Sequence, residues 1–200
     1  MNSRRAFLAA TPLLVLAAGC DKFLPAAKPV FHGVDVTGSD LGPDFRLQDP
    51  DGKVRTLADF RGKVVALFFG YTQCPDVCPT TLSDHAAAMR LLGADAGRVQ
   101  VLFVSVDPKR DTAELLRQYV PAFHPTFLGL RGDDEQTAQV KKDFRIYAEV
   151  RKGSTPESYT VDHSAQTLVF DTQGKLRLVH AYATPADKLA ADFKLLLANG

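Results

Sequence analysis

The sequence has almost no excess of either charge. Its 200 residues contain 24 Lys and Arg against 23 Asp and Glu, a formal net charge of +1, and no basic run. Proteins that bind nucleic acid or acidic surfaces usually carry a basic patch, so we expect no such partner. No repeat or low-complexity segment occurs, and the length suits one globular domain with its own core.

The chain also lacks an apolar run long enough to cross a bilayer at its N-terminus. The run from Ala6 to Ala18 is shorter than the roughly 20 residues that a membrane-spanning helix needs. It follows a basic start, so we predict that residues 1–19 are an export signal. Arg4-Arg5 before Ala6-Phe7-Leu8 resembles a twin-arginine signal, with an ordinary Sec-type positive region as the alternative.

Only three cysteines are present, and the first follows the export signal directly. Leu16-Ala17-Ala18-Gly19-Cys20 resembles a bacterial lipobox, which implies that Cys20 is lipidated and becomes the mature N-terminus. Residues 20–44 are rich in Pro, Gly, Ser and Asp without periodicity, which is typical of a tether. Asp21 resembles an inner-membrane retention signal. We therefore expect a domain held in the periplasm by a lipid anchor on the bacterial inner membrane.

The rest of the chain, residues 45–200, is predicted to form a single α/β domain. Continuous apolar runs indicate strands buried on both faces, and turn sequences at 49–52 and 171–174 indicate hairpins. The expected elements are a hairpin over 45–57, strands at 63–69, 99–106 and 127–130, helices at 79–92, 111–119 and 133–144, an extended segment at 146–150, a second hairpin from 167–170 and 176–180, and a closing helix from 185. This order predicts a thioredoxin-like fold with a mixed central sheet, helices on both faces and an N-terminal β-hairpin.

Proline and one capping pattern mark where helices begin. Pro79 and Pro185 suit the first turn of a helix, where the missing N–H is not needed. Asp111 precedes Glu114 by the spacing of a capping box, so we expect Asp111 to cap the helix that reaches Tyr119.

The other two cysteines, Cys74 and Cys78, lie between a buried strand and a helix. A helix N-terminus favours a thiolate and lowers its pKa. The pair therefore suits three roles: a structural disulfide, a redox pair, or part of a metal site for a soft ion such as Cu(I), with Zn(II) also tolerated. A disulfide closing so short a loop stabilises a fold only modestly, which disfavours the first role.

A third ligand is needed for a metal site, and five histidines are available. Four fit poorly: His32 lies in the tether, His85 two helical turns beyond the cysteines, His124 in a turn and His180 on an outer strand. His163 comes just before the strand at 167–170, where a thioredoxin-like fold usually places a cis-proline against the sulfurs. No proline occurs from residue 157 to 184, so we predict His163 as a metal ligand.

Three stretches resemble one known family. They are FGYTQCPDVCP at 69–79, SVDPKRDT at 105–112 and VDHS at 161–164. Together they are similar to the Sco/SenC proteins, copper-binding assembly factors of cytochrome c oxidase. The resemblance implies one copper ion, Cu(I) or Cu(II), held by Cys74, Cys78 and His163. It also implies delivery of copper to, or reduction of thiols at, the dinuclear copper site of oxidase subunit II.

Three aspartates near the proposed ligands each allow two interpretations. Asp162 either orients a ligand or starts a turn, Asp76 either tunes the charge of the site or is simply solvated, and Asp107 either supports the site or begins a turn. A metallochaperone of this kind would need a periplasmic copper donor and a thioredoxin-like reductant. The alternative function is a thiol–disulfide oxidoreductase acting on exported proteins, with Cys74 as nucleophile and Cys78 as its redox partner.

Overall fold

The structure is a computed structural model that describes residues 29–155 and 158–199. The predicted export signal and the lipidation site Cys20 lie outside these residues. Within the described ranges, no helix is both long and apolar enough to cross a membrane.

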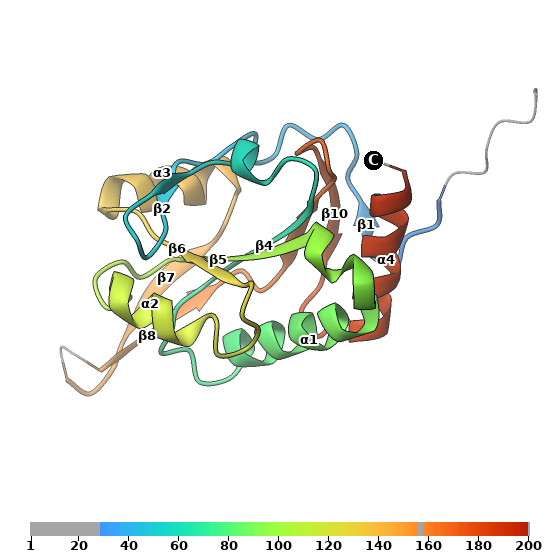
Figure 1. The fold of residues 1–200 in the computed structure, drawn as a ribbon. Helices are drawn as coiled ribbons and strands as arrows, with labels where there is room; N and C mark the ends of the chain where they lie inside the picture. The colour runs from blue at the N-terminus through green and yellow to red at the C-terminus, as the bar shows by residue number, and fades with distance from the viewer. Residues whose placement is uncertain (1–28, 156–157, 200) are drawn as a thin grey trace, which may run out of the picture.

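A six-stranded mixed sheet forms the centre of the molecule (Figure 1). Its order is β1-β10-β9-β4-β5-β6, with β4, β5 and β6 parallel and the other neighbours antiparallel. The strands are β1 (Val34–Asp35), β4 (Val64–Gly70), β5 (Val99–Ser105), β6 (Leu128–Leu130), β9 (Thr167–Phe170) and β10 (Leu176–His180). Every residue of β4 and β5 is buried, as their continuous apolar runs predict.

Alternate residues of the central strands serve two separate cores. Val64, Ala66 and Phe68 pack with α1 (Val77–Leu92), α2 (Ala113–Tyr119) and α4 (Ala186–Ala198) on one face. Val65, Leu67 and Phe69 pack on the other face against α3 (Asp134–Asp143), the 3₁₀ turn η1 (Leu57–Phe60) and the N-terminal hairpin, which comprises β2 (Leu47–Gln48) and β3 (Val54–Arg55). The predicted mixed sheet with helices on both faces is confirmed (Figure 1).

Part of the predicted tether belongs to this fold. Strand β1 pairs with β10, and the backbone N–H groups of His32 and Gly33 donate to the buried carboxylate of Asp192 on α4. The packed domain therefore begins near residue 31, not at residue 45. The composition of this segment did not reveal its place in the fold, because hydrogen bonds from two backbone N–H groups to a carboxylate far along the chain leave no periodic pattern in the sequence.

The predicted N-cap of the second helix is wrong by one residue. Thr112 is the N-cap of α2, and its hydroxyl accepts a hydrogen bond from the Leu115 N–H at 3.2 Å. Asp111 is turned inward and is bonded elsewhere. The extended segment near 146–150 is β7 (Ala148–Lys152), and it pairs with an unpredicted strand, β8 (Tyr159–His163). Another 3₁₀ turn, η2 (Gly93–Arg98), joins α1 to β5.

Two buried histidines predict acid sensitivity. His85 is 2% exposed, and burial lowers its pKa to about 4 although its bond to the Thr81 carbonyl opposes the shift. Burial also lowers the pKa of His180, which lies beside Asp192. Both histidines are neutral in the folded protein but take up a proton near pH 6.5 when unfolded. The stability that His85 contributes is therefore fully present above about pH 6.5 and is lost as the pH falls towards 4, and the contribution of His180 changes in the same direction.

By pH 5, the contribution of His85 to the free energy of unfolding is expected to fall by about 2 kcal/mol. Urea unfolding at pH 7 and pH 5 measures this loss. His85→Asn should remove most of it, because asparagine keeps a donor for the Thr81 carbonyl and does not titrate. His32→Asn, at an exposed histidine, is the control. An unchanged pH dependence in His85→Asn would contradict the assignment.

Candidate metal centre

The cysteine loop connects the end of β4 to the start of α1. Asp76 occupies the N-cap position of α1, Cys78 is the second helical residue, and Pro79 lies in the first turn as predicted. Cys78 is fully buried and Cys74 is half-buried. At Gly70, a Cβ atom would lie 2.7 Å from the Cys78 sulfur, so only glycine leaves room for that sulfur.

His163 reaches the cysteines from the last residue of β8. Its Nδ1–H donates to the Ser164 carbonyl at 2.9 Å, so Nε2 is the ring nitrogen that faces the sulfurs. Nε2 lies 3.4 Å from the Cys78 sulfur. The edge of the ring packs against Phe68 and Tyr71, with centroids 6.1 and 5.8 Å away, so its orientation is fixed by packing as well.

Three potential ligand atoms therefore meet. The sulfurs of Cys74 and Cys78 and an imidazole nitrogen of His163 all lie within 4.8 Å of one another. Two soft thiolates and one imidazole suit a thiophilic transition-metal ion. Among the described residues, this is the only group of three or more such side chains that could hold a metal. An open groove of about 430 Å³ reaches Cys74 and His163 from solvent.

The pKa values of the two thiols are shifted in opposite directions. The hydrogen bond from Cys78, supported by bonds from His163 and from the start of α1, lowers the pKa of Cys74 to about 3. The same bond with Cys74, together with burial, raises the pKa of Cys78. Burial opposes the protonation of His163, but its bonds to Cys74 and the Ser164 carbonyl raise its pKa. The metal-free site thus holds one thiolate nucleophile, Cys74, beside a protonated Cys78.

Neither the Asp76 carboxylate nor the Asp162 carboxylate is hydrogen-bonded to a ligand side chain, although the Asp76 backbone N–H bonds Cys74. Asp76 is exposed, and its carboxylate accepts only a long 3.4 Å bond from Thr80. Asp162 is exposed as well and pairs with Arg151 at 2.7 Å. The interpretation of Asp162 as the residue that orients the His163 ring is wrong, because the Ser164 carbonyl already occupies Nδ1.

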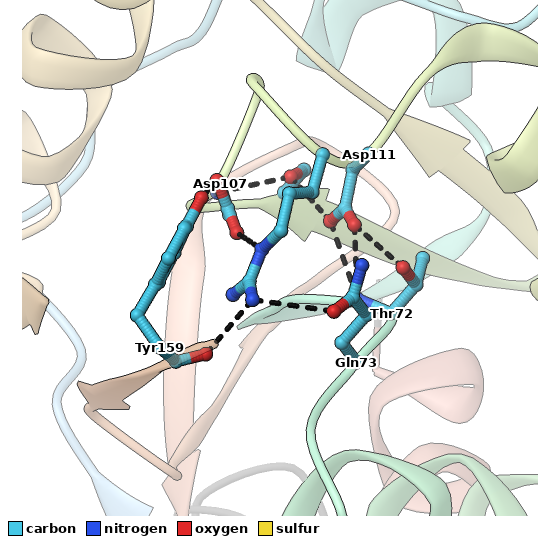
Figure 2. Close-up of polar contacts among 7 residues, drawn as sticks. Thr72, Gln73, Asp107, Asp111 and Tyr159 are labelled. Carbon is cyan, nitrogen blue, oxygen red and sulfur yellow. Dashed lines mark hydrogen bonds and ion pairs between the residues drawn. The ribbon is translucent and has the colours of Figure 1, made fainter. Parts of the chain in front are cut away.

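Asp107 supports the site indirectly, through Arg110 and Tyr159. Its buried carboxylate accepts from the Tyr159 hydroxyl at 2.9 Å and from the Arg110 Nε–H (Figure 2). Arg110 in turn donates from Nη1 to the Tyr159 carbonyl at 2.8 Å and to the Gln73 side chain at 3.2 Å. Its guanidinium carbon lies 3.5 Å from the centroid of the Tyr159 ring. Arg110 therefore ties β8, which ends at His163, to the loop that carries Cys74.

Asp111 forms a second brace under the same loop. Its carboxylate is 1% exposed and accepts hydrogen bonds from the Thr72 N–H at 3.1 Å, the Thr72 hydroxyl at 2.6 Å and the Ser105 hydroxyl at 2.6 Å (Figure 2). Sequence reasoning missed Arg110, Asp111, Thr72 and Tyr159. The stretch SVDPKRDT was the available clue, but its local pattern indicated only a helix cap.

The family model described as SCO1/SenC matches residues 34–198, nearly the whole described domain. The chain belongs to the SCO1/SenC family. The mitochondrial SCO2 homolog of Bos taurus is 41% identical over 148 residues, a match that covers 73% of this chain and 56% of the bovine protein. The chain thus spans little more than half the length of that relative.

Solved structures of SCO1/SenC relatives have the same fold. Copper-bound ScoI of Bradyrhizobium japonicum is 37% identical, with a TM-score of 0.72 over 78% of this chain and 99% of that one. BsSco, described as a member of the Sco family of cytochrome c oxidase assembly proteins with a disulfide switch, is 21% identical, with a TM-score of 0.62 over 86% and 99% of the two chains. At that identity BsSco supports the fold alone. The predicted thioredoxin-like fold is confirmed.

Proposed function

We propose that this protein binds one copper ion through Cys74, Cys78 and His163 and serves in the assembly of cytochrome c oxidase. The observation that carries this proposal is the meeting of the three ligand atoms within 4.8 Å, with the imidazole tautomer fixed by the Ser164 carbonyl. Membership of the SCO1/SenC family and the copper bound in a relative 37% identical support it.

The client, the membrane anchor and the partner proteins are inferred from the sequence. We propose that the client is the dinuclear copper site of oxidase subunit II, and that lipidated Cys20 anchors the domain to the periplasmic face of the bacterial inner membrane. A periplasmic copper donor would load the site, and a thioredoxin-like protein would keep its thiols reduced. Metabolic labelling of Cys20 with a radioactive fatty acid tests the anchor; Cys20→Ser should abolish the label.

The residues of the site account for the binding and the release of the copper ion. Cys74 is a thiolate at neutral pH and makes first contact with the ion from the open groove. Cys78 must then lose its proton to solvent before both sulfurs bind, because Nε2 of His163 has to keep its lone pair to act as the third ligand. Release follows either when partner thiolates replace the ligands or when the two sulfurs form a disulfide, which has no thiolate to offer.

A thiol–disulfide exchange function is favoured by the position of Cys74, which the open groove reaches while Cys78 is buried behind it; the bond with Cys78 also lowers the pKa of Cys74. The Cys74 thiolate would attack a disulfide of the client and form a mixed disulfide, releasing one client thiolate. Cys78 would then lose its proton and attack the Cys74 sulfur, releasing the second client thiolate and leaving a Cys74–Cys78 disulfide. The two electrons pass to the client. The same pair would thereby prepare client thiols that copper later occupies.

Copper stoichiometry on the full chain tests the proposed function. The protein would carry Cys20→Ser, so that Cys74 and Cys78 are its only thiols. With the thiols reduced, we expect one tightly bound copper per chain in competition with a chelator. After oxidation to the disulfide, binding should be lost. Weak binding in the reduced form, together with turnover of a disulfide substrate, would favour the exchange function instead.

Arg110→Lys is expected to weaken copper binding by roughly tenfold, within the range seen for residues that position ligands. Lysine keeps the charge but cannot stack on Tyr159 while bonding both Gln73 and the Tyr159 carbonyl. Arg117→Lys, at an exposed arginine of α2, should leave the affinity unchanged. Unaltered affinity in Arg110→Lys would show that Arg110 does not position the ligands.

A further inference from the structure

A groove of about 660 Å³ lies between the β7–β8 hairpin, the loop that follows β5 and one face of α3. We call it the hairpin groove. Its volume falls within the roughly 300 to 1,000 Å³ that is typical of ligand-binding pockets. Val106 and Pro108 line it from the loop, and it shares no residue with the open groove that reaches Cys74 and His163.

Apolar surface lies open on the hairpin side of this groove. Val150 of β7 pairs with Val161 of β8, so both side chains lie on the same face of the hairpin. Val161 is 6% exposed because that face packs against the body of the protein, whereas Val150 is 55% exposed. The packed face of the hairpin is therefore covered at Val161 and left open at β7, where Val150 and Tyr159 line the groove.

Three lysines line the groove together with this apolar surface. Each comes from a different part of the fold: Lys109 from the loop after β5, Lys141 from α3 and Lys152 from β7. Among the described residues, none of their ammonium groups takes part in a hydrogen bond or an ion pair. The three are far apart in the sequence, so no basic run indicated the charge that the fold gathers here.

Two carboxylates also line the groove, but they do not cancel this charge. The carboxylate of Asp107 is already paired with Arg110 and accepts a hydrogen bond from the Tyr159 hydroxyl (Figure 2). Asp134 on α3 supplies the other. Three lysines against one remaining carboxylate leave the groove with a net positive charge, which attracts anionic groups.

The arrangement of these charges suits a peptide better than a small inorganic anion. A small anion is bound by donors that converge on it, such as an arginine fork or successive backbone N–H groups. Here Lys109 and Lys152 are exposed, and the lysines are spread around apolar walls. Apolar surface with charged groups at its rim is the usual anatomy of a protein–protein interface.

We propose that the hairpin groove docks an acidic peptide segment of a partner protein, in which an apolar side chain is flanked by Asp or Glu. Tyr159 begins β8 and His163 ends it, so the two are about 13 Å apart along the strand. A partner held in the groove would thus have its neighbouring surface at the metal centre. Its use in copper transfer rests on the proposed function, whereas docking itself does not.

Peptide binding to the metal-free, reduced full chain carrying Cys20→Ser tests the proposal. The probe is a short fluorescein-labelled peptide with a central phenylalanine flanked by glutamates, and anisotropy measures its binding. We expect saturable binding that weakens as salt is added, and none with lysines in place of the glutamates. Lys109→Gln, Lys141→Gln and Lys152→Gln together should weaken it roughly tenfold, because three modest ion pairs are lost.

Lys175→Gln, Lys188→Gln and Lys194→Gln together are the matched control. They remove the same charge from exposed lysines of α4 and the β9–β10 turn, outside the groove, and should leave peptide binding unchanged. Both triple variants should still bind one copper ion per chain, so a failure of docking and a failure of the copper site are distinguishable. Absence of saturable peptide binding, or an equal loss in the two variants, would overturn the proposal.

Discussion

His163→Ala is expected to weaken copper binding by at least about 100-fold, equivalent to about 2.7 kcal/mol of binding free energy. The substitution removes one of three ligand atoms, and nothing else nearby can replace it, because Asp162 is turned towards Arg151. Cu(II) should lose more affinity than Cu(I), since two thiolates alone satisfy the softer ion better. Chelator competition on the reduced protein, run separately for the two oxidation states, measures both changes.

His124→Ala serves as the control for this substitution, because His124 lies in the turn before β6, is half-buried and is hydrogen-bonded to Thr126. The His163 ring also packs against Phe68 and Tyr71, so the free energy of unfolding of the metal-free variant should be measured alongside. If copper affinity proved indifferent to His163 in a folded variant, the three-ligand site would be wrong and a redox role for the cysteines would be the better account.

Asp111→Ala is expected to lower the free energy of unfolding by about 3 kcal/mol. Three donors, the N–H and hydroxyl of Thr72 and the hydroxyl of Ser105, converge on this buried carboxylate. Alanine leaves the donors without that acceptor, and an unsatisfied buried donor costs about 1 to 3 kcal/mol. Urea unfolding at constant pH measures the loss.

Asp111→Asn is the matched variant, because it keeps the shape and one accepting oxygen. We expect it to lose only about 1 kcal/mol, because the Ser105 hydroxyl can turn its hydrogen away and accept from the new amide N–H. The alanine variant should also bind copper more weakly, since Thr72 lies two residues before Cys74. A loss below about 1 kcal/mol in Asp111→Ala would contradict the bracing role.

Periodicity and local turns were enough to predict most of the fold. The fully buried strands β4 and β5 are continuous apolar runs, and the hairpin turns at Asp49 and Asp171 are stabilised by those aspartates, which accept nearby backbone N–H groups. The polar strand β8 was missed because only one of its five residues, Val161, is buried. Its pairing with β7 is a tertiary event that hydrophobic pattern does not record.

The ligands of the candidate site were predictable and their supports were not. Cysteine spacing and the absent proline drew attention to Cys74, Cys78 and His163. Asp111 was misjudged because its capping-box spacing is a local pattern, whereas its partner Thr72 is 39 residues away. Likewise, His163 is oriented by the backbone carbonyl of Ser164, and every residue type has such a carbonyl, so the sequence gives no sign of this contact. Contacts made by backbone atoms or across long chain separations require coordinates.

The hairpin of β7 and β8 forms a two-stranded sheet of its own, outside the six-stranded sheet. Cys74 and Cys78 belong to the main body, whereas His163 ends this separate hairpin. A bound ion would therefore act as a cross-link between two parts of the molecule, closing a chain separation of 85 residues between Cys78 and His163. Unloading would remove this cross-link and leave the hairpin held by contacts such as those of Asp107 and Arg110 with Tyr159, so its position would be less restricted in the empty protein than in the loaded one.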